Sequence, residues 1–330
     1  MAKSNLKHPL IIILVIAVLA IAAWFFFTST VNKKAEEHLQ QYLVENNLQD
    51  RVKWEELEAS ATGTANLKKV RFLSEDGELL LTAEEFNLKH FKQDENLLET
   101  EVEIKGFVDV QGMSFQDTLA ELYGMADVPP SNYIDLNWKV KLDNTKQTSY
   151  VKSDVLLPNL FSVETEINAD SPKEIRELSK LSSNAFSREE PNQEELMIFI
   201  STMGKVKIQG LNVGVVEKGG IEKLRYEMVG SDLDDEENEM SSEQFQKQFE
   251  QEIAEAQVMC VNEPQLAKVL ANQELACSKV MGFLVGASDA VKVNMSVKKP
   301  LSLDEITMMS LMGVDADMLV EEYGLSVEVE

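Results

Sequence analysis

Residues 291–298 have the sequence VKVNMSVK, and this alternation decides the fold. Every second residue from Val291 to Val297 is apolar, and the residues between them are lysine, asparagine and serine. Successive side chains of a β-strand point to opposite faces of a sheet. The stretch therefore predicts a strand with one apolar face and one polar face.

The same strand-like pattern recurs along the chain. We expect further strands at residues 64–73, 78–83, 97–108, 134–142, 149–156, 160–168, 206–216, 221–228 and 325–329. Turn residues Glu75, Asp76 and Gly77 predict one hairpin, and the EKGG sequence of residues 217–220 predicts another between 206–216 and 221–228. Hairpins join antiparallel strands, whereas parallel strands need long crossover connections, so the sheet is predicted to be mainly antiparallel.

Several serines can cap helices between these strands, because an acid or amide follows three residues later. The pairs are Ser114 with Asp117, Ser171 with Glu174, Ser241 with Gln244, and Ser302 with Glu305. The first and last pairs have similar flanking sequences, which fits either two related halves or recurrence of a common cap. We predict an α+β fold: a twisted, mainly antiparallel sheet covered by amphipathic helices.

The uncharged run from Leu10 to Phe27 predicts one transmembrane helix. Eighteen helical residues span roughly 27 Å, close to a hydrocarbon core of about 30 Å. A cleavable signal peptide is the alternative, since Ala20 and Ala22 have the spacing of a cleavage site. The run is longer than the usual signal core, which favours an anchor.

The expected organisation follows from that anchor. Residues 1–9 form a cytoplasmic tail, 10–27 a signal-anchor helix, 28–50 a helical stem, and 51–330 a periplasmic α+β domain with a subdivision near 185–200. Flanking lysines are nearly balanced, so orientation depends on the short N-terminal tail and on the cysteine pair described below. We expect a single-pass protein of the bacterial inner membrane with its N-terminus in the cytoplasm.

The composition excludes a nucleic-acid partner. The chain has 31 basic and 57 acidic residues and a formal net charge of −26, which repels polyanions. The acidic run at residues 232–239 lacks the glycine that an EF-hand loop requires, since Glu237 occupies the sixth position, and we interpret it as a solvated loop. We predict neither a metal site nor a cofactor.

Enzymatic motifs are also lacking in the sequence. No glycine-rich phosphate loop follows a strand, and the three histidines (His8, His38 and His90) stand in no nucleophile-elbow context. We therefore predict that the protein is not an enzyme. A hydrolase that uses paired carboxylates is the enzymatic alternative, but nothing singles out two acids.

Cys260 and Cys277 are the only cysteines. Asn262 and Pro264 between them predict a helix start, so a disulfide could bridge a helical hairpin. Such a bond would stabilise the fold by about 3 kcal/mol on the chain-entropy model. The alternatives are two buried free thiols or a redox site, and the latter lacks Cys-x-x-Cys spacing.

Methionines are concentrated near the C-terminus. Met295, Met308, Met309 and Met312 are candidates for lining an apolar ligand site, because flexible thioethers adapt to irregular apolar partners. The alternative is that they fill an ordinary core between a helix and the sheet.

Residues 10–108 resemble the AsmA-type single-pass envelope proteins of bacteria. The shared features are the N-terminal membrane helix and the positions Trp54, Leu57, Gly63, Val70, Phe72, Asp76, Gly77, Leu81, Ala83, Phe86 and Leu88. The resemblance implies strands that begin an extended groove, with a role in phospholipid movement or outer-membrane homeostasis.

Together these observations predict a non-enzymatic protein of envelope maintenance. It would contact the bilayer through Leu10 to Phe27 and bind a phospholipid or another apolar ligand. The alternative is a scaffold for a membrane or envelope protein. An apolar cavity would favour ligand binding, and an exposed apolar patch would favour scaffolding.

Overall fold

The computed structural model describes residues 40, 43–44, 49–60, 64–74, 76–110, 116–126, 128–178, 193–220, 242–312 and 316–330. The predicted anchor at 10–27 and most of the predicted stem lie outside these ranges. No helix within them combines the length and apolarity needed to cross a bilayer.

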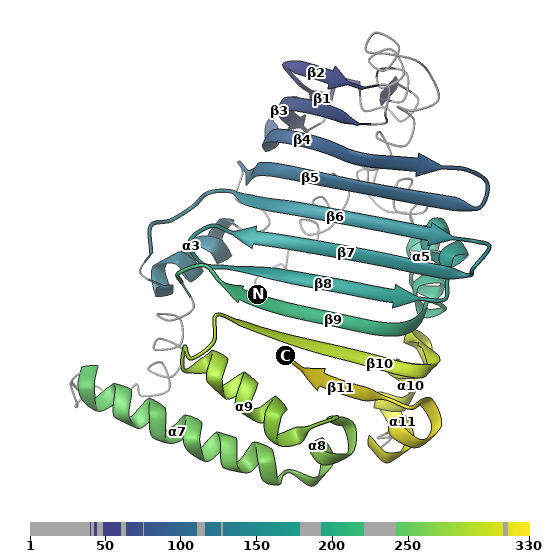
Figure 1. Ribbon diagram of the computed structural model, residues 1–330. Coiled ribbons are helices and arrows are strands. Elements are labelled where there is room, and N and C mark those ends of the chain that lie inside the picture. Colours follow the sequence, from purple (N-terminus) through teal and green to yellow (C-terminus); the bar gives the residue numbers. More distant parts are fainter. Residues whose placement is uncertain are drawn as a thin grey trace.

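The fold is α+β and is built on one antiparallel sheet of eleven strands (Figure 1). The strands are β1 (Val52–Lys53), β2 (Glu56–Ala59), β3 (Ala65–Leu73), β4 (Leu79–Gln93), β5 (Leu97–Asp109), β6 (Ile134–Asp143), β7 (Thr148–Leu157), β8 (Phe161–Ala169), β9 (Lys207–Glu217), β10 (Ala290–Ser302) and β11 (Ser326–Val329). Their spatial order is β1, then β3 to β11 in sequence, with β2 beside β3. Since β8 pairs with β9, the sheet continues across the expected subdivision near 185–200.

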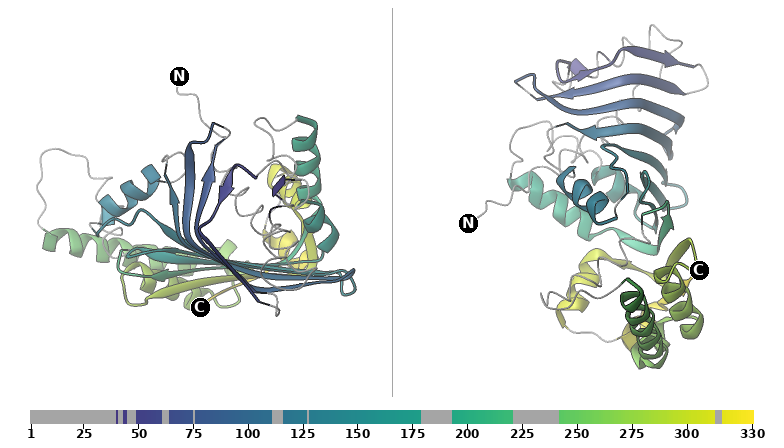
Figure 2. Two further views of the ribbon diagram at one scale, coloured as in Figure 1. Left: turned by 90° about the horizontal axis from the view of Figure 1, so that it is seen from above. Right: turned by 90° about the vertical axis from the view of Figure 1, so that its left-hand side faces the viewer.

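The seven described helices with named bounds lie around the sheet (Figure 2). They are α3 (Gln116–Ala126), α5 (Gln193–Gly204), α7 (Ser242–Asn262), α8 (Pro264–Val269), α9 (Gln273–Leu284), α10 (Leu303–Met312) and α11 (Ala316–Tyr323). In Figure 2, α3 lies near one end of the strands, and α5 lies near the other end with α10 and α11. Both groups are on the same side of the sheet.

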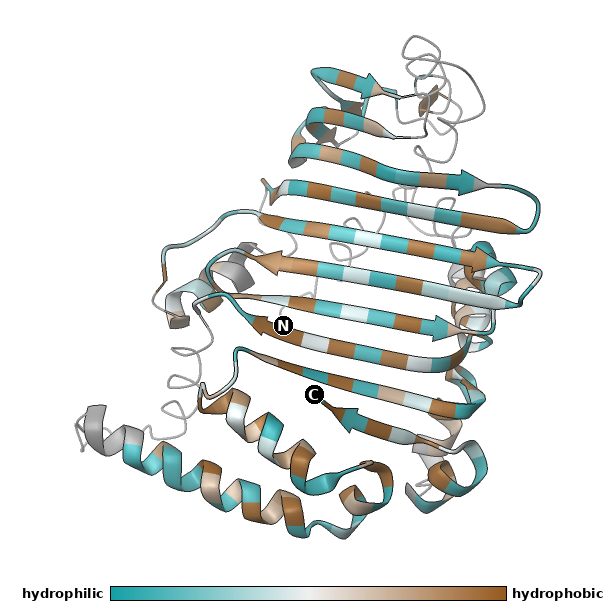
Figure 3. Cartoon of the chain, viewed as in Figure 1, coloured by the Kyte–Doolittle hydropathy of each residue, from teal (hydrophilic) through white to brown (hydrophobic). Residues whose placement is uncertain are grey.

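Alternation along the strands gives the sheet its two chemical faces (Figure 3). On β6, for example, Leu136, Trp138 and Val140 share one face, and Lys139 and Lys141 share the other. The register then places apolar side chains opposite apolar ones, and polar or charged side chains opposite each other, on most positions of the neighbouring strands. The strands predicted within the described ranges are therefore present, although β4 extends ten residues beyond the predicted end at residue 83. The strand predicted at 221–228 lies outside those ranges.

The predicted hairpin between 206–216 and 221–228 is wrong. Strand β9 pairs with β8 along one edge and with β10 along the other, so neither edge of its central part remains for residues 221–228. The turn residues are used differently: Lys218 and Gly220 both donate backbone hydrogen bonds to Leu160, at 3.0 and 3.2 Å. They tie the end of β9 to the turn that precedes β8.

The predicted cap at Ser302 is formed. The Ser302 hydroxyl accepts from the Glu305 N–H at 3.1 Å, and the Glu305 carboxylate accepts from the Ser302 N–H at 2.8 Å. This reciprocal capping box starts α10. At the second predicted cap, the Ser171 hydroxyl accepts from the Lys207 N–H at 2.9 Å, and it fastens that helix start to β9.

The tightest core lies on the apolar face of the first strands. Val70, Leu88, Ile104 and Phe107 are almost fully buried there, and Leu43 joins the same cluster at 1% exposure. Residues 43–44 are helical. The predicted stem therefore contacts the sheet at Leu43.

Candidate apolar ligand site

Three rows of side chains cross the apolar face of the sheet at right angles to the strands. The first row is Ile104, Leu136, Val155, Val163, Val215 and Val291. The second row is Val102, Trp138, Ser153, Thr165, Val213, Val293 and Val329. The third row is Thr100, Val140, Val151, Ile167, Leu211, Met295 and Val327. None of these side chains is charged.

The rows differ in burial from one strand to the next. Their members on β5 are core residues, with Ile104 only 2% exposed. From β6 to β9 every member is half-buried. The described helices stand near the two ends of these strands, so side chains in the middle keep part of their surface accessible. A contiguous, partly accessible apolar surface of this extent is typical of an interaction site.

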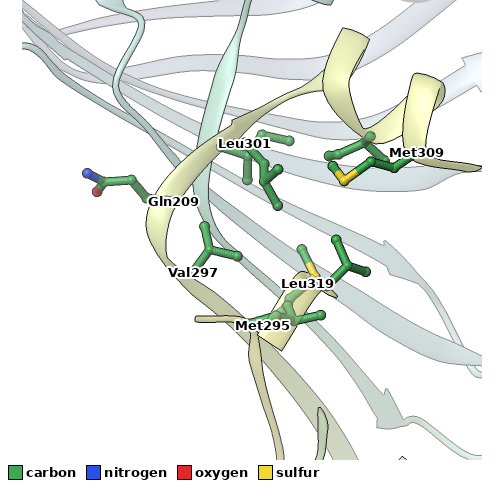
Figure 4. A pocket seen from close by; sticks show the side chains of 9 residues that line it. Gln209, Met295, Val297, Leu301, Met309 and Leu319 are labelled. Atoms are coloured by element: carbon green, nitrogen blue, oxygen red, sulfur yellow. The ribbon is translucent and has the colours of Figure 1, made fainter. Parts of the chain in front are cut away.

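A pocket of about 270 Å³ continues the third row beyond β9 (Figure 4). Its lining residues are Ile208, Gln209, Met295, Val297, Leu301, Ile306, Met309, Leu319 and Leu325. In Figure 4 the side chains of Val297, Leu301 and Met309 point toward one another, whereas Gln209 points away from them. The pocket lies between β10 and the helices α10 and α11, and eight of its nine lining residues are apolar.

The structure separates the four candidate methionines. Met295 and Met309 both line the pocket. Met308, the preceding residue on α10, is 57% exposed and does not line the pocket. Met312 ends α10, and its side chain lies outside the described part of the chain.

The opposite face of the sheet is a lattice of ion pairs. Lys105 Nζ lies 3.1 Å from Glu85 Oε2, and Lys89 Nζ lies 2.8 Å from Glu103 Oε1. Similar pairs continue across β5 to β8, at Lys139–Glu101, Lys141–Glu99 and Lys152–Glu166. Across β6 to β8 the charged side chains thus lie on one face. The first strands differ, because the buried Asp109 is paired with Leu81 of the apolar cluster.

These contacts shift the ionisation of the polar face. Hydrogen bonds from Asn87 and Lys105 lower the pKa of Glu85, and the bond to Glu85 raises the pKa of Lys105. For Glu166, burial opposes ionisation, but hydrogen bonds from Asn212 and Lys152 outweigh it and lower the pKa. All three shifts favour the charged forms, so this face keeps its ion pairs at neutral pH.

Cys260 and Cys277 form a disulfide with an S–S distance of 1.98 Å. It joins α7 to α9, and Cys277 is fully buried. Next to these helices, the Ala271 N–H donates to Val327 O at 2.9 Å, which satisfies part of the outer edge of β11. The disulfide therefore holds together the helices that close the last edge of the sheet.

Among the described residues, those suggestive of catalysis do not converge. His90 is exposed on β4. Within the described ranges, no three His, Cys, Asp or Glu side chains come together as a metal site. The acidic run at 232–239 and the serines Ser114 and Ser241 lie outside those ranges.

Sequence reasoning missed the residues that carry the site. Alternation identified each strand, but only the register brings Trp138, Ser153 and Thr165 into one row. A sequence signal was present, because these three residues are the polar or amphipathic members of otherwise aliphatic faces.

No protein-family model matches this sequence, and no curated protein matches it either.

Proposed function

We propose that this chain is a single-pass protein of the bacterial inner membrane whose periplasmic domain binds lipid acyl chains along the three rows. The observation that carries the proposal is the uncharged, half-buried apolar surface from β6 to β9. Burial of such a surface is favourable by about 25 cal/mol per Å². An acyl chain supplies a matching surface without a polar group along its length.

The dimensions agree with this ligand. The accessible part of the third row, from Val140 to Val327, crosses six strands, and strand spacing of about 4.8 Å makes it about 24 Å long. One leaflet of a bilayer has a hydrocarbon thickness of about 15 Å, so the row can accommodate an extended acyl chain. The pocket at Met295 is larger than the roughly 150 Å³ cavity that admits benzene and smaller than most drug-sized sites. It suits the end of one chain rather than a whole lipid.

The position of Leu43 supports a location near the membrane. Leu43 is sixteen positions after Phe27 in the sequence, and a helix over that interval would span about 24 Å. Since Leu43 is buried beside β3 to β5, the first strands would lie closer to the bilayer than the last. The rows would then lead away from the membrane, which suits a non-enzymatic role in holding or passing lipid for envelope maintenance.

A charge placed in the first row tests the proposal. Val163→Asp should reduce the phospholipid that co-purifies with the full chain, because a carboxylate there would be desolvated against the ligand. Ser162→Asp is the matched control, since Ser162 lies next along β8 on the polar face. Both variants keep the lipids that surround the anchor, so the difference between them reports on the rows.

The measurement is the amount of lipid per protein, obtained by solvent extraction and mass spectrometry after exchange into an amphipathic polymer. We expect Val163→Asp to hold at least about tenfold less row-bound lipid, which corresponds to 1.4 kcal/mol or more. Circular dichroism checks that both variants fold. Equal lipid content in the two folded variants and the parent would refute lipid binding on the rows.

A second candidate function is scaffolding, and one observation favours it. Helix α5 exposes four large apolar side chains: Met197, Ile198, Ile200 and Met203. An exposed cluster of this kind suits a protein partner. Crosslinking in membranes should yield one discrete protein adduct that Met197→Lys with Ile200→Lys abolishes and that Lys205→Ala retains. An adduct that persists in the double variant would exclude this surface.

A further inference from the structure

Trp138 lies in the second row and carries a buried polar atom in the middle of the apolar face. Its indole Nε1 is inaccessible to solvent and has no hydrogen-bond partner among the described residues. Buried indole N–H groups usually find a partner. A buried donor left without one destabilises the folded state, because it has lost its hydrogen bond to water. An acceptor from a ligand would remove that penalty, provided that the half-buried indole turns its N–H toward the accessible side of the row.

The neighbours of Trp138 extend this polar segment across three strands. Ser153 on β7 is paired directly with Trp138, and Thr165 on β8 is paired directly with Ser153. Opposed side chains in a sheet have Cβ atoms about 4.5–5.5 Å apart. The second row therefore places an indole and two hydroxyl groups side by side between two aliphatic rows.

Thr100 adds a further buried group nearby. It is 7% exposed, and its Oγ1 also has no partner within the described part of the chain. Thr100 is opposed to Val140, two residues beyond Trp138 on β6, so it is a diagonal neighbour of the indole. Diagonal neighbours lie about 7–8 Å apart, within reach of one ligand headgroup.

The ligand's acceptor must be neutral. No lysine or arginine occurs in the three rows, so a carboxylate at Trp138 would lose hydration without gaining a counter-charge. An ester carbonyl accepts a hydrogen bond and carries no charge. It is also attached to an acyl chain, which the first and third rows can hold on either side.

We propose that Trp138 is a specificity-determining residue that donates a hydrogen bond to the ester carbonyl of an acylglycerol lipid. The inference rests on the proposed function, because the acyl chain must bind along the rows. It adds that ester-linked chains bind in preference to plain hydrocarbon. Ser153, which is paired directly with Trp138, provides the adjoining hydroxyl group.

The test uses fluorescence quenching of Trp138 in the full chain. Trp24→Phe with Trp54→Phe leaves Trp138 as the single tryptophan. The protein is placed in nanodiscs of an ether-linked phosphatidylcholine, which has no ester carbonyl to compete. Two quenchers of equal chain length are added: dibrominated methyl stearate and dibrominated octadecane.

We expect the ester to quench half of the emission at about two- to tenfold lower mole fraction than the alkane. That ratio corresponds to a net hydrogen-bond contribution of about 0.5–1.5 kcal/mol. Incorporation of 1-methyltryptophan at position 138 keeps the ring and removes the N–H. The ester preference should then disappear while the alkane quenches as before.

The outcomes distinguish failure of the Trp138 proposal from failure of acyl binding on the rows. Equal quenching by ester and alkane would overturn the role of Trp138 but leave acyl binding on the rows in place. An ester preference that survives methylation would also overturn it, because another donor would be responsible. If neither compound quenches Trp138 at mole fractions that saturate the surrounding bilayer, both proposals fail.

Discussion

The apolar face is buried on β3 to β5 and half-buried on β6 to β9, although one sheet and one alternating pattern produce both regions. Ile104 on β5 and Val163 on β8 belong to the same row and are separated by one paired residue on β6 and one on β7. Only Ile104 is a core residue. The comparison teaches that alternation determines which face is apolar, whereas packing partners determine whether that face is a core or a binding surface.

The largest expected effect separates these two regions directly. Ile104→Ala should lower the free energy of unfolding by about 2–5 kcal/mol, because it leaves a cavity in a close-packed cluster. Val163→Ala in the same row should cost clearly less, since its surroundings are only partly packed. Denaturant unfolding of the full chain in nanodiscs measures both. Equal losses would show that β8 is as much a core strand as β5.

The disulfide should give the next largest effect. Cys260→Ala with Cys277→Ala removes the crosslink between α7 and α9, and the chain-entropy model predicts a loss of about 3 kcal/mol at most. The loss should concentrate in the helices beside β11. Hydrogen exchange would detect faster exchange in α7 and α9 with little change in β3 to β5. Uniformly faster exchange would contradict a local role.

Removal of the α10 cap should have a smaller effect. Ser302→Ala deletes the hydroxyl that accepts the Glu305 N–H, which typically costs about 1 kcal/mol. It should also loosen the wall of the Met309 pocket without affecting the buried cluster of the first strands. Ser296→Ala, on the same strand but outside the cap, is the control. A thermal melt in which both variants match the parent would refute the importance of the capping box.

Acid should lower the free energy of unfolding through carboxylates on the polar face and at the α10 cap, because the apolar rows contain no titratable group. The folded-state pKa values of Glu85, Glu166 and Glu305 are lowered, so their stabilisation is present above the unfolded value of about 4.3 and is lost as pH falls through the folded values. Stability should therefore decline below about pH 4, by a small amount for Glu85, whose carboxylate is partly exposed and screened by solvent. Lys105→Gln should weaken the part of this pH dependence that Glu85 contributes. If stability falls with decreasing pH in this variant as it does in the parent, the contribution of the Glu85–Lys105 pair would be contradicted.

Alternation was sufficient to predict the strands at Ile134–Asp143 and Ala290–Ser302, and the Ser302–Glu305 spacing was sufficient to predict a capping box. Both are local features, set by neighbours two to four residues apart. Pairing of β9 with β8 and β10 depends on distant segments, so the EKGG turn alone led to a wrong hairpin.

The candidate site also depends on contacts between distant segments, which local sequence patterns do not specify. Two of the candidate methionines, Met295 and Met309, line one pocket, whereas Met308 is adjacent to Met309 on α10 and is exposed. The contribution of Trp138 depends on its partners across β6, β7 and β8, and no local pattern specifies them. Sequence alone therefore located the apolar face and left its accessible part unassigned.

The most direct test is photocrosslinking in bacterial membranes with p-benzoylphenylalanine at Val163 or at Glu164 of the full chain. The two positions are adjacent on β8 and lie on opposite faces of the sheet. After irradiation, mass spectrometry of the purified protein identifies any covalent adduct. We predict phospholipid adducts at position 163 and none at position 164. Protein adducts without lipid at position 163, or equal lipid adducts at both positions, would contradict an acyl-binding face.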